Sequence, residues 1–404
     1  MDDITVHCLP IKYMSLENGT MYRILYENSS FLRWEGKGRD HTLTGDIFLI
    51  NVLQSNACLF TAREALWCLK RKDEEHKMLY EKSCKICGGT DMHVIDRRTY
   101  YACCAVDLPA YEQKRYKVLF EIWFPGEEEV TLESVSCTTC GFVCYFPRPD
   151  EGDMDAKYRY LEILGQDYGT SSPDADVEHR RSAAIYSYVN RYVASANIGS
   201  VLDYGGGDGR LMHAFRHSGA QCNLIDYNKN CIESVTRLGD TVDVLDRNQT
   251  FDLVVCSHVI EHVPAPRQLL EQLAAHLSDD GVLFIEVPME IWRRAPLQNE
   301  PVTHINFFTP ASLANLALLA GMTISDCRLC ACLHPSSAWH HGVRCILRKT
   351  AGTPGGDHPH LRSPDVDAYL RPTVLDAIRY YRANFRGVTP AVYDRIRAGV
   401  KLFS

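Results

Sequence analysis

The sequence predicts an α/β protein built on a mainly parallel sheet with helices on both faces. From Val201 onward, apolar β-prone runs alternate with helical patterns. The glycine-rich turn Asp203-Tyr204-Gly205-Gly206-Gly207-Asp208-Gly209 joins the first run to a helical pattern, and the next apolar run ends in Asp226. Strand, glycine turn, helix and strand in this order place a helix N-terminus and an open loop against a nucleotide-like ligand.

The glycine spacing distinguishes between nucleotide cofactors. A dinucleotide-binding turn has the pattern G-x-G-x-x-G, but the third glycine is replaced by Arg210 in one frame and by Met212 in the other. The pattern D-x-G-x-G-x-G instead resembles motif I of the class I S-adenosylmethionine-dependent methyltransferases. The resemblance implies that Asp203 holds the amino group of this cofactor, that Asp226 holds its ribose and that Tyr227 lies against its adenine. It also places Gly205, Gly207 and Gly209 against the methionine part.

Length and composition indicate the number of domains, the class of partner and the cellular compartment. A chain of 404 residues predicts two or three domains, and we expect boundaries at 1–80, 81–150, 151–350 and 351–404. The net charge of -8 argues against a nucleic-acid binder that relies on a basic surface. The chain has no apolar run of membrane-spanning length, and its acidic start, Met1-Asp2-Asp3, does not resemble a signal peptide. We therefore expect a cytoplasmic protein whose 17 cysteines are free thiols or metal ligands.

Two C-x-x-C-G sequences predict a metal site. Cys84 and Cys87 form the first pair, and Cys137 and Cys140 form the second. Four thiolates favour a structural zinc ion with no open position, whereas unbound core thiols are the alternative. Between the pairs we expect a strand at Lys117–Phe124.

The segment after the second pair carries a further resemblance. It contains Pro147-Arg148-Pro149, several tyrosines and a helical pattern over 177–194. This order is similar to that of a subgroup of class I methyltransferases with an N-terminal pair of C-x-x-C-G turns, which includes sugar C-methyltransferases. The resemblance covers residues 84–349, and it implies a small-molecule acceptor such as a sugar, a nucleotide-linked sugar or a natural-product intermediate.

The rest of the sheet follows from alternating patterns. We expect helices at 231–238, at 267–277 and after Pro310, and strands at 241–244, 251–256, 281–287, 323–329 and 343–348. The last two strands fit the antiparallel pair that closes the seven-stranded sheet of this family. At the end of the expected third strand, Asp243 and Val244 would flank the adenine, although a solvated loop is the alternative.

Two loops supply the candidate catalytic residues. After the fourth strand, the resemblance places Ser257 and His258 at the cofactor, while Glu261 and His262 are more often structural. In the long loop 288–309, His304 can take a proton near neutral pH, or it can anchor the loop. Related sugar C-methyltransferases carry a glutamate where this chain has Thr303, which argues against that specific reaction.

In the same loop, Arg293 and Arg294 are candidates for binding a phosphate or carboxylate of the acceptor, with a solvated basic pair as the alternative.

The two ends of the chain are less informative. We expect strands at 22–26 and 46–50 and a helix from Thr61, and a helical tail from Leu375 that packs on the body or on a second subunit of a homodimer.

Two other functions remain open besides small-molecule methyl transfer. One is an RNA- or protein-modifying methyltransferase, and the other is a scaffold without catalysis.

Overall fold

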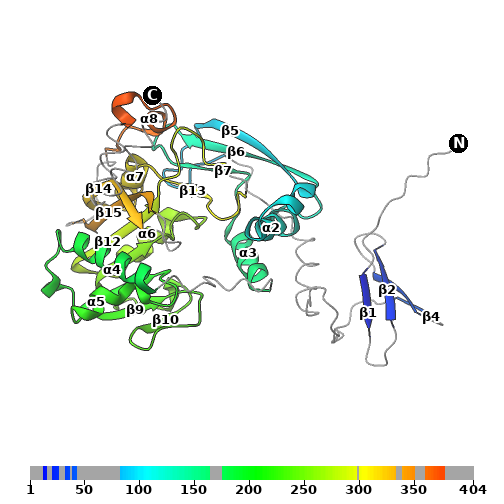
Figure 1. The fold of residues 1–404 in the computed structure, drawn as a ribbon, viewed down its shortest axis with the longest axis horizontal. Coiled ribbons are helices and arrows are strands. Elements are labelled where there is room, and N and C mark those ends of the chain that lie inside the picture. Colours follow the sequence, from blue (N-terminus) through cyan, green and yellow to red (C-terminus); the bar gives the residue numbers. More distant parts are fainter. Residues whose placement is uncertain are drawn as a thin grey trace. The chain divides into compact units, whose positions relative to one another are not determined.

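The computed structural model describes two compact units, Met1–Lys77 and Met78–Ser404, each of which is described by itself (Figure 1). The described residues are 12–15, 21–26, 32–36, 39–42, 82–163, 175–297, 300–333, 339–350 and 360–377. The expected strand at 46–50, the helix from Thr61 and the tail beyond residue 377 lie outside them.

The described part of the first unit is an antiparallel sheet. Its strands are β1 (Lys12–Ser15), β2 (Met21–Tyr26), β3 (Leu32–Gly36) and β4 (Arg39–Thr42), paired in that order. The expected strand at 22–26 is confirmed as β2.

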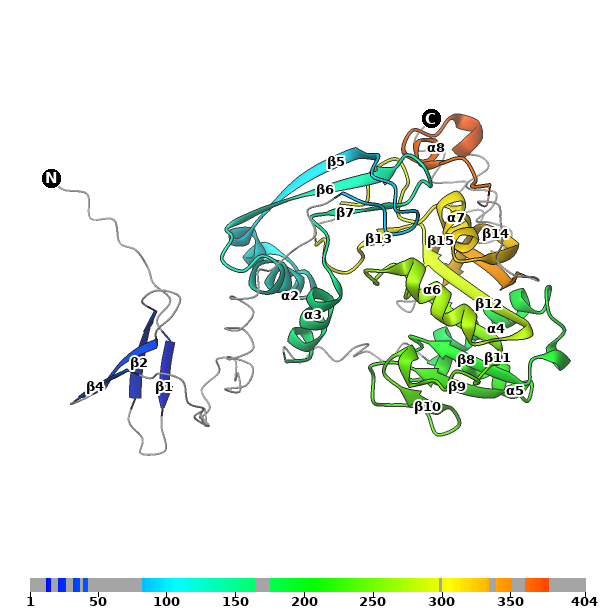
Figure 2. The ribbon, with the colours of Figure 1, turned by 180° about the vertical axis from the view of Figure 1, so that it is seen from behind.

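The second unit contains a seven-stranded sheet in the order β10-β9-β8-β11-β12-β15-β14 (Figure 2). The strands are β8 (Ser200–Tyr204), β9 (Gln221–Ile225), β10 (Thr236–Gly239), β11 (Phe251–Ser257), β12 (Leu277–Pro288), β14 (Met322–Leu333) and β15 (Trp339–Lys349). The first five are parallel, whereas β15 pairs antiparallel with both β12 and β14. The expected seven-stranded α/β sheet with a final antiparallel pair is confirmed.

Helices cover this sheet. Helix α4 (Ala175–Val189) packs on α5 (His213–His217), and both contribute to an apolar core that includes Leu253 and Val255 of β11. The alternating residues Val254 and Cys256 are also buried, so both faces of the strand are covered. Helix α6 (Pro266–Ala275) packs on α7 (Pro310–Leu319). As expected, α7 begins at Pro310.

The region after β9 differs from the sequence expectation. We expected a helix at 231–238 and a strand at 241–244, but the third strand is β10, and Val242–Val244 forms a short 3-10 helix. An isolated helix of eight residues is marginal in water. Pairing of β10 with β9 supplies backbone hydrogen bonds instead, and Val235 fills the core from the preceding loop.

A second expectation fails between the cysteine pairs. The expected strand at Lys117–Phe124 is helical, because α2 (Ala110–Lys117) continues as the π-helix Val118–Trp123. The residues Val118, Leu119, Phe120 and Trp123 are all buried. A short run of buried apolar residues has no readable period, and so it does not distinguish a strand from a buried helix.

A smaller antiparallel sheet joins the cysteine-rich part to the long loop after β12. It has the order β13-β7-β6-β5, with β5 (Met92–Tyr101), β6 (Glu129–Cys137), β7 (Val143–Phe146) and β13 (Asn306–Phe307). Because β13 pairs with β7, the segment next to His304 is held by the smaller sheet.

The Pro-Arg-Pro segment extends this connection through a buried guanidinium. Arg148 is fully buried, and it donates to the carbonyl oxygens of Ile305 (3.2 Å) and Pro264 (2.8 Å) and to Oδ1 of Asn306 (2.6 Å). The Asn306 amide in turn donates to the carbonyl oxygens of Ile260 (2.8 Å) and Val263. One side chain therefore joins the loop after β11 to the loop after β12.

The described start of the C-terminal tail packs on the body. The side chain of Asn315 in α7 exchanges two hydrogen bonds with the backbone of Arg362, at 2.7 and 2.9 Å. Helix α8 (Val366–Leu370) follows, with Val366 buried. Among the described residues, no helix combines the length and hydrophobicity needed to cross a membrane.

We predict that Arg148→Met lowers the free energy of unfolding by about 3 kcal/mol, because it leaves several buried acceptors without a donor. Urea-induced unfolding measures the change. The matched control is Arg97→Met, whose side chain is 66% exposed and should change stability by less than about 0.5 kcal/mol. Equal effects of the two substitutions would contradict the prediction.

Candidate functional site

A cavity of about 620 Å³ opens at the carboxyl ends of the parallel strands, where ligands bind in such sheets. Residues from the end of β8, the end of β9, the loop after β10, the loop after β11 and helix α3 (Glu151–Ile163) line it. Of the predicted site residues, the cavity brings together Gly205, Asp226, Tyr227, Asp243 and His258.

The glycine turn lies at the edge of this cavity in a conformation that requires glycine. Gly205, Gly207 and Gly209 have φ values of 74°, 64° and 85°. A Cβ on Gly205 would lie 2.4 Å from Cγ2 of Val259, and a Cβ on Gly206 would lie 1.9 Å from Oδ2 of Asp203. The turn therefore packs directly on the side chain of Asp203 and against the loop after β11.

Asp226 links the end of β9 to the turn. Its Oδ2 accepts a hydrogen bond from the amide of Gly207 at 2.8 Å, and its Oδ1 accepts one from Asn228 at 2.7 Å. Burial raises the pKa of this carboxyl, while the two amides oppose the rise. The carboxylate is thus oriented by the backbone at the cavity wall.

Asp203 lies beneath the turn and does not line the cavity. It is 1% exposed, and neither carboxylate oxygen has a hydrogen-bond partner among the described residues. Burial raises its pKa well above the ordinary value. A nearby cation such as an ammonium group would stabilise the charged form of a carboxyl group that is buried without a hydrogen-bond partner.

The other predicted cofactor residues differ in position. Tyr227 is 49% exposed at the cavity, and its ring centroid lies 5.9 Å from that of Tyr158. Asp243 lines the cavity, but Val244 does not, and it lies exposed beside Gly239. Ser257 is buried and donates to Glu286 at 3.3 Å, away from the cavity.

His258 occupies a left-handed backbone conformation with a φ of 58°, which is costly for a residue other than glycine. Its Nδ1 lies 3.4 Å from Oε1 of Glu261, and its Nε2 lies 3.5 Å from Oε1 of Glu286. Burial lowers the pKa of this imidazole, but interactions with Cys332 and these two carboxylates raise it well above its usual value.

His262 and His304 come from the two loops that Arg148 joins, and their ring centroids are 4.8 Å apart. Nδ1 of His262 lies 2.7 Å from the carbonyl oxygen of Thr303, and Nδ1 of His304 lies 2.8 Å from Oε2 of Glu290. Burial lowers the pKa of His262 to about 3. The carboxyl of Glu261, between these groups and His258, has a pKa of about 2, because the nearby imidazoles outweigh the effect of burial.

A second cavity of about 400 Å³ lies beside the first, and Thr303 lines both. Its wall includes His304, Arg294, Arg98 and several carboxylates. Arg294 thus takes a position suited to an anionic ligand. Its neighbour Arg293 does not line this cavity.

Lys157, which no sequence pattern singles out, also lines the first cavity. Its side chain is 3% exposed, and Nζ donates to the carbonyl oxygen of Val302 at 2.7 Å. Burial lowers the pKa of this lysine to about 7; Glu300 opposes the shift and Arg115 adds to it. A lysine in a helix is normally read as a solvated residue, so only the fold reveals this one.

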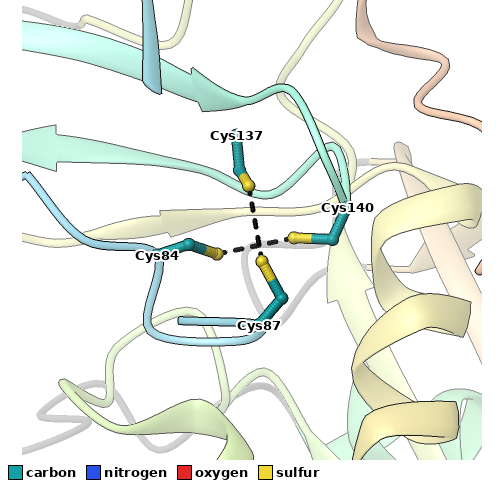
Figure 3. A group of neighbouring side chains, drawn as sticks. All are labelled: Cys84, Cys87, Cys137 and Cys140. Atoms are coloured by element: carbon teal, nitrogen blue, oxygen red, sulfur yellow. Dashed lines mark hydrogen bonds between the residues drawn. The ribbon is translucent and has the colours of Figure 1, made fainter. Parts of the chain in front are cut away.

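The four predicted cysteine ligands converge in the smaller sheet (Figure 3). The sulfur atoms of Cys84 and Cys140 are 3.4 Å apart, and those of Cys87 and Cys137 are 3.5 Å apart. In both pairs the glycine after the second cysteine donates its amide to the first cysteine's carbonyl oxygen, at 2.9 Å, with a positive φ. The neighbouring pair Cys103-Cys104 is exposed and takes no part.

Part of the chain is similar to known methyltransferases. Residues 177–325 match the family described as "Methyltransferase domain". A probable S-adenosylmethionine-dependent methyltransferase of Mycobacterium tuberculosis is 25% identical over 241 residues, which cover 53% of this chain and 85% of that protein. A ubiquinone biosynthesis O-methyltransferase of Actinobacillus pleuropneumoniae is 33% identical over 101 residues, covering 21% of this chain and 43% of that protein.

The chain is an S-adenosylmethionine-dependent methyltransferase. A solved structure, the 1,6-didemethyltoxoflavin-N1-methyltransferase of Burkholderia thailandensis, aligns with a TM-score of 0.40 and 20% identity, covering 55% of this chain and 95% of that one. The residues matched by the family include the glycine turn, Asp226 and the loop after β11.

Lys157 gives the methyltransferase a predicted pH dependence of stability. Its folded pKa of about 7 lies below the ordinary 10.5, so between these values the unfolded chain binds a proton that the folded chain does not. Stability relative to Lys157→Met should therefore rise with pH above 7, by about 1 kcal/mol per pH unit. Urea unfolding of both proteins from pH 6 to 9 measures the difference, and a difference independent of pH would contradict the prediction.

Proposed function

We propose that the enzyme methylates a small polar acceptor that carries an anionic group, such as a sugar, a nucleotide-linked sugar or a natural-product intermediate. The observation that supports this proposal most is the second cavity, which adjoins the first at Thr303. Arg98 and Arg294 in its wall suit a phosphate or carboxylate, and Glu290 and Glu300 suit hydroxyl groups.

The first cavity would hold the cofactor. When bound, S-adenosylmethionine supplies an activated methyl group on a sulfonium. We assign the ribose hydroxyls to Asp226, whose carboxylate the backbone already orients, and the amino group to Asp203, whose buried oxygens have no partner among the described residues. Tyr227 and Asp243 line the same cavity and would flank the adenine.

The histidines would act between the two cavities. His304 donates from Nδ1 to Glu290, an arrangement that turns Nε2 into a proton acceptor for the attacking group. His258 faces two carboxylates and lines the cofactor cavity, so its charge would orient the loop there.

We further propose that the four cysteines hold a structural zinc ion, as in the subgroup that the sequence resembles. Four sulfurs about 2.3 Å from a tetrahedral ion lie about 3.8 Å from one another, close to the observed 3.4 and 3.5 Å. A zinc ion with four protein ligands has no open position for substrate, so its role would be structural. It would stabilise the smaller sheet, with which β13 pairs.

An RNA- or protein-modifying methyltransferase is the second interpretation. It would depend on contacts from the arginine-rich tail beyond residue 377, which lies outside the described residues. The polar second cavity favours the small acceptor, because a recessed pocket of about 400 Å³ suits a ligand of that size.

We predict contrasting effects for two substitutions. Asp226→Ala should weaken S-adenosylhomocysteine binding about 100-fold, because a carboxylate that accepts two ribose hydroxyls contributes a few kcal/mol. His304→Ala should lower kcat while leaving that affinity within about threefold of the wild type. Calorimetry and initial-rate kinetics measure the two quantities. Equal loss of affinity in both variants would show that His304 supports folding rather than turnover.

We also predict that the purified protein contains zinc and that Cys84→Ser/Cys137→Ser loses one equivalent per chain, because two thiolates cannot retain the ion. Elemental analysis by mass spectrometry measures the zinc content per chain, and the control Cys103→Ser should keep its zinc. Zinc retained in the double variant would refute the assignment.

A further inference from the structure

A second group of metal-type ligands lies where the two cavities meet. The ligand atoms of Glu261, His262 and His304 all lie within 4.8 Å of one another. These residues come from two loops, so no sequence motif joins them. The group is separate from the four cysteines, and none of its members belongs to the proposed cofactor contacts.

The hydrogen bonds of both histidines fix their tautomers. A backbone carbonyl can only accept, so Nδ1 of His262 carries the proton that it gives to Thr303, and Nε2 keeps its lone pair. An ionised carboxylate likewise only accepts, so His304 donates from Nδ1 to Glu290, and in the neutral imidazole its Nε2 carries the lone pair. A histidine ligand held by a carbonyl or carboxylate on its other nitrogen is the usual arrangement around protein metals.

Glu261 supplies the negative charge. Its side chain is 1% exposed, and neither of its oxygens accepts a hydrogen bond of good geometry from the described residues. Nδ1 of His258 lies 3.4 Å from its Oε1, and Nε2 of His262 lies 3.8 Å from the same atom. The imidazoles stabilise the charged carboxylate through these long contacts, and a bound cation would give its oxygens direct ligation.

The backbone around the group is already fixed. The carbonyl oxygen of Glu261 accepts the amides of Ile305 and Asn306, both at 3.0 Å, and Arg148 binds the same two loops. The three ligands are therefore held at their spacing by hydrogen bonds that do not use their ligand atoms. Preorganisation of this kind favours ion binding because the ligand side chains lose little conformational entropy when the ion binds.

We propose that Glu261, His262 and His304 bind a divalent transition-metal ion of the zinc and manganese class at the junction of the two cavities. Two imidazoles and one carboxylate are a common ligand set of catalytic ions, which keep a position open for water or substrate. Glu290 and the carbonyl of Thr303 form the outer support.

The role of the ion rests on the methyl transfer proposed above. A hydroxyl of the acceptor bound to the ion has a lowered pKa and loses its proton to solvent. Its oxygen then forms the bond to the methyl carbon as the carbon–sulfur bond breaks, and the electron pair remains on sulfur. With the ion bound, Nε2 of His304 would be a metal ligand and the ion would activate the hydroxyl; without the ion, Nε2 would accept the proton as proposed above.

The experiment is a titration of Mn²⁺, followed by electron paramagnetic resonance, into full-length protein whose cysteine site is kept loaded with zinc. Four thiolates select zinc over manganese, so the signal reports the second site. We expect one Mn²⁺ per chain in the wild type and in the surface control His217→Gln. Glu261→Gln should lose this binding, and Glu290→Gln should weaken it about 10- to 100-fold.

Affinity for S-adenosylhomocysteine shows that each variant is folded, and Glu290→Gln provides a test at a partly exposed residue if Glu261→Gln does not fold. Absence of Mn²⁺ binding to the wild type, or equal binding by wild type, Glu261→Gln and Glu290→Gln, would overturn the proposal. Binding is measured without acceptor, so a failure of the proposed methyl transfer would leave the manganese result unchanged, and the two failures are distinguishable.

Discussion

The arrangement of the site depends on the buried guanidinium of Arg148. It donates to backbone and side-chain acceptors in the loop after β11 and in the loop after β12, and so fixes the separation of His262 and His304. Because β13 also pairs with β7, the smaller sheet and its cysteine cluster belong to the same support. The buried charge of Arg148 is stabilised because several hydrogen-bond acceptors surround the guanidinium group. The cysteine-rich part is therefore tied to the loops that carry His262 and His304.

The two cavities have different physical characters. The first is bounded by Gly205 of the glycine turn and by the Asp226 carboxylate that the backbone orients, with Asp203 buried beneath the turn, which suits a nucleoside with a cationic side chain. The second combines guanidinium groups with carboxylates, which suits a hydroxylated anion. The histidines lie between them, so a methyl group and its acceptor would meet beside imidazoles and a buried carboxylate. This division follows from which strand ends and loops meet at the carboxyl edge of the sheet.

Sequence patterns were sufficient where one local rule dominates. The glycine turn after β8, the start of α7 at Pro310 and the two cysteine pairs each depend on short-range chemistry, and the structure has them at the residues that the sequence predicts. Predictions failed at 231–244, where pairing with β9 overrides the helical pattern, and at Val118–Trp123, where complete burial removes periodicity. Lys157 and the grouping of Glu261 with His304 could not be predicted, because each depends on contacts between distant segments. No spacing rule describes such contacts.

The central claim is that the cavity beside the glycine turn binds the methyl donor and opens toward the histidines. A crystal structure of the protein with S-adenosylhomocysteine tests it most directly. The account predicts the ribose on Asp226, the amino group near Asp203 and the sulfur directed toward Thr303 and His304. A ligand found elsewhere, or one whose sulfur points away from the second cavity, would contradict it.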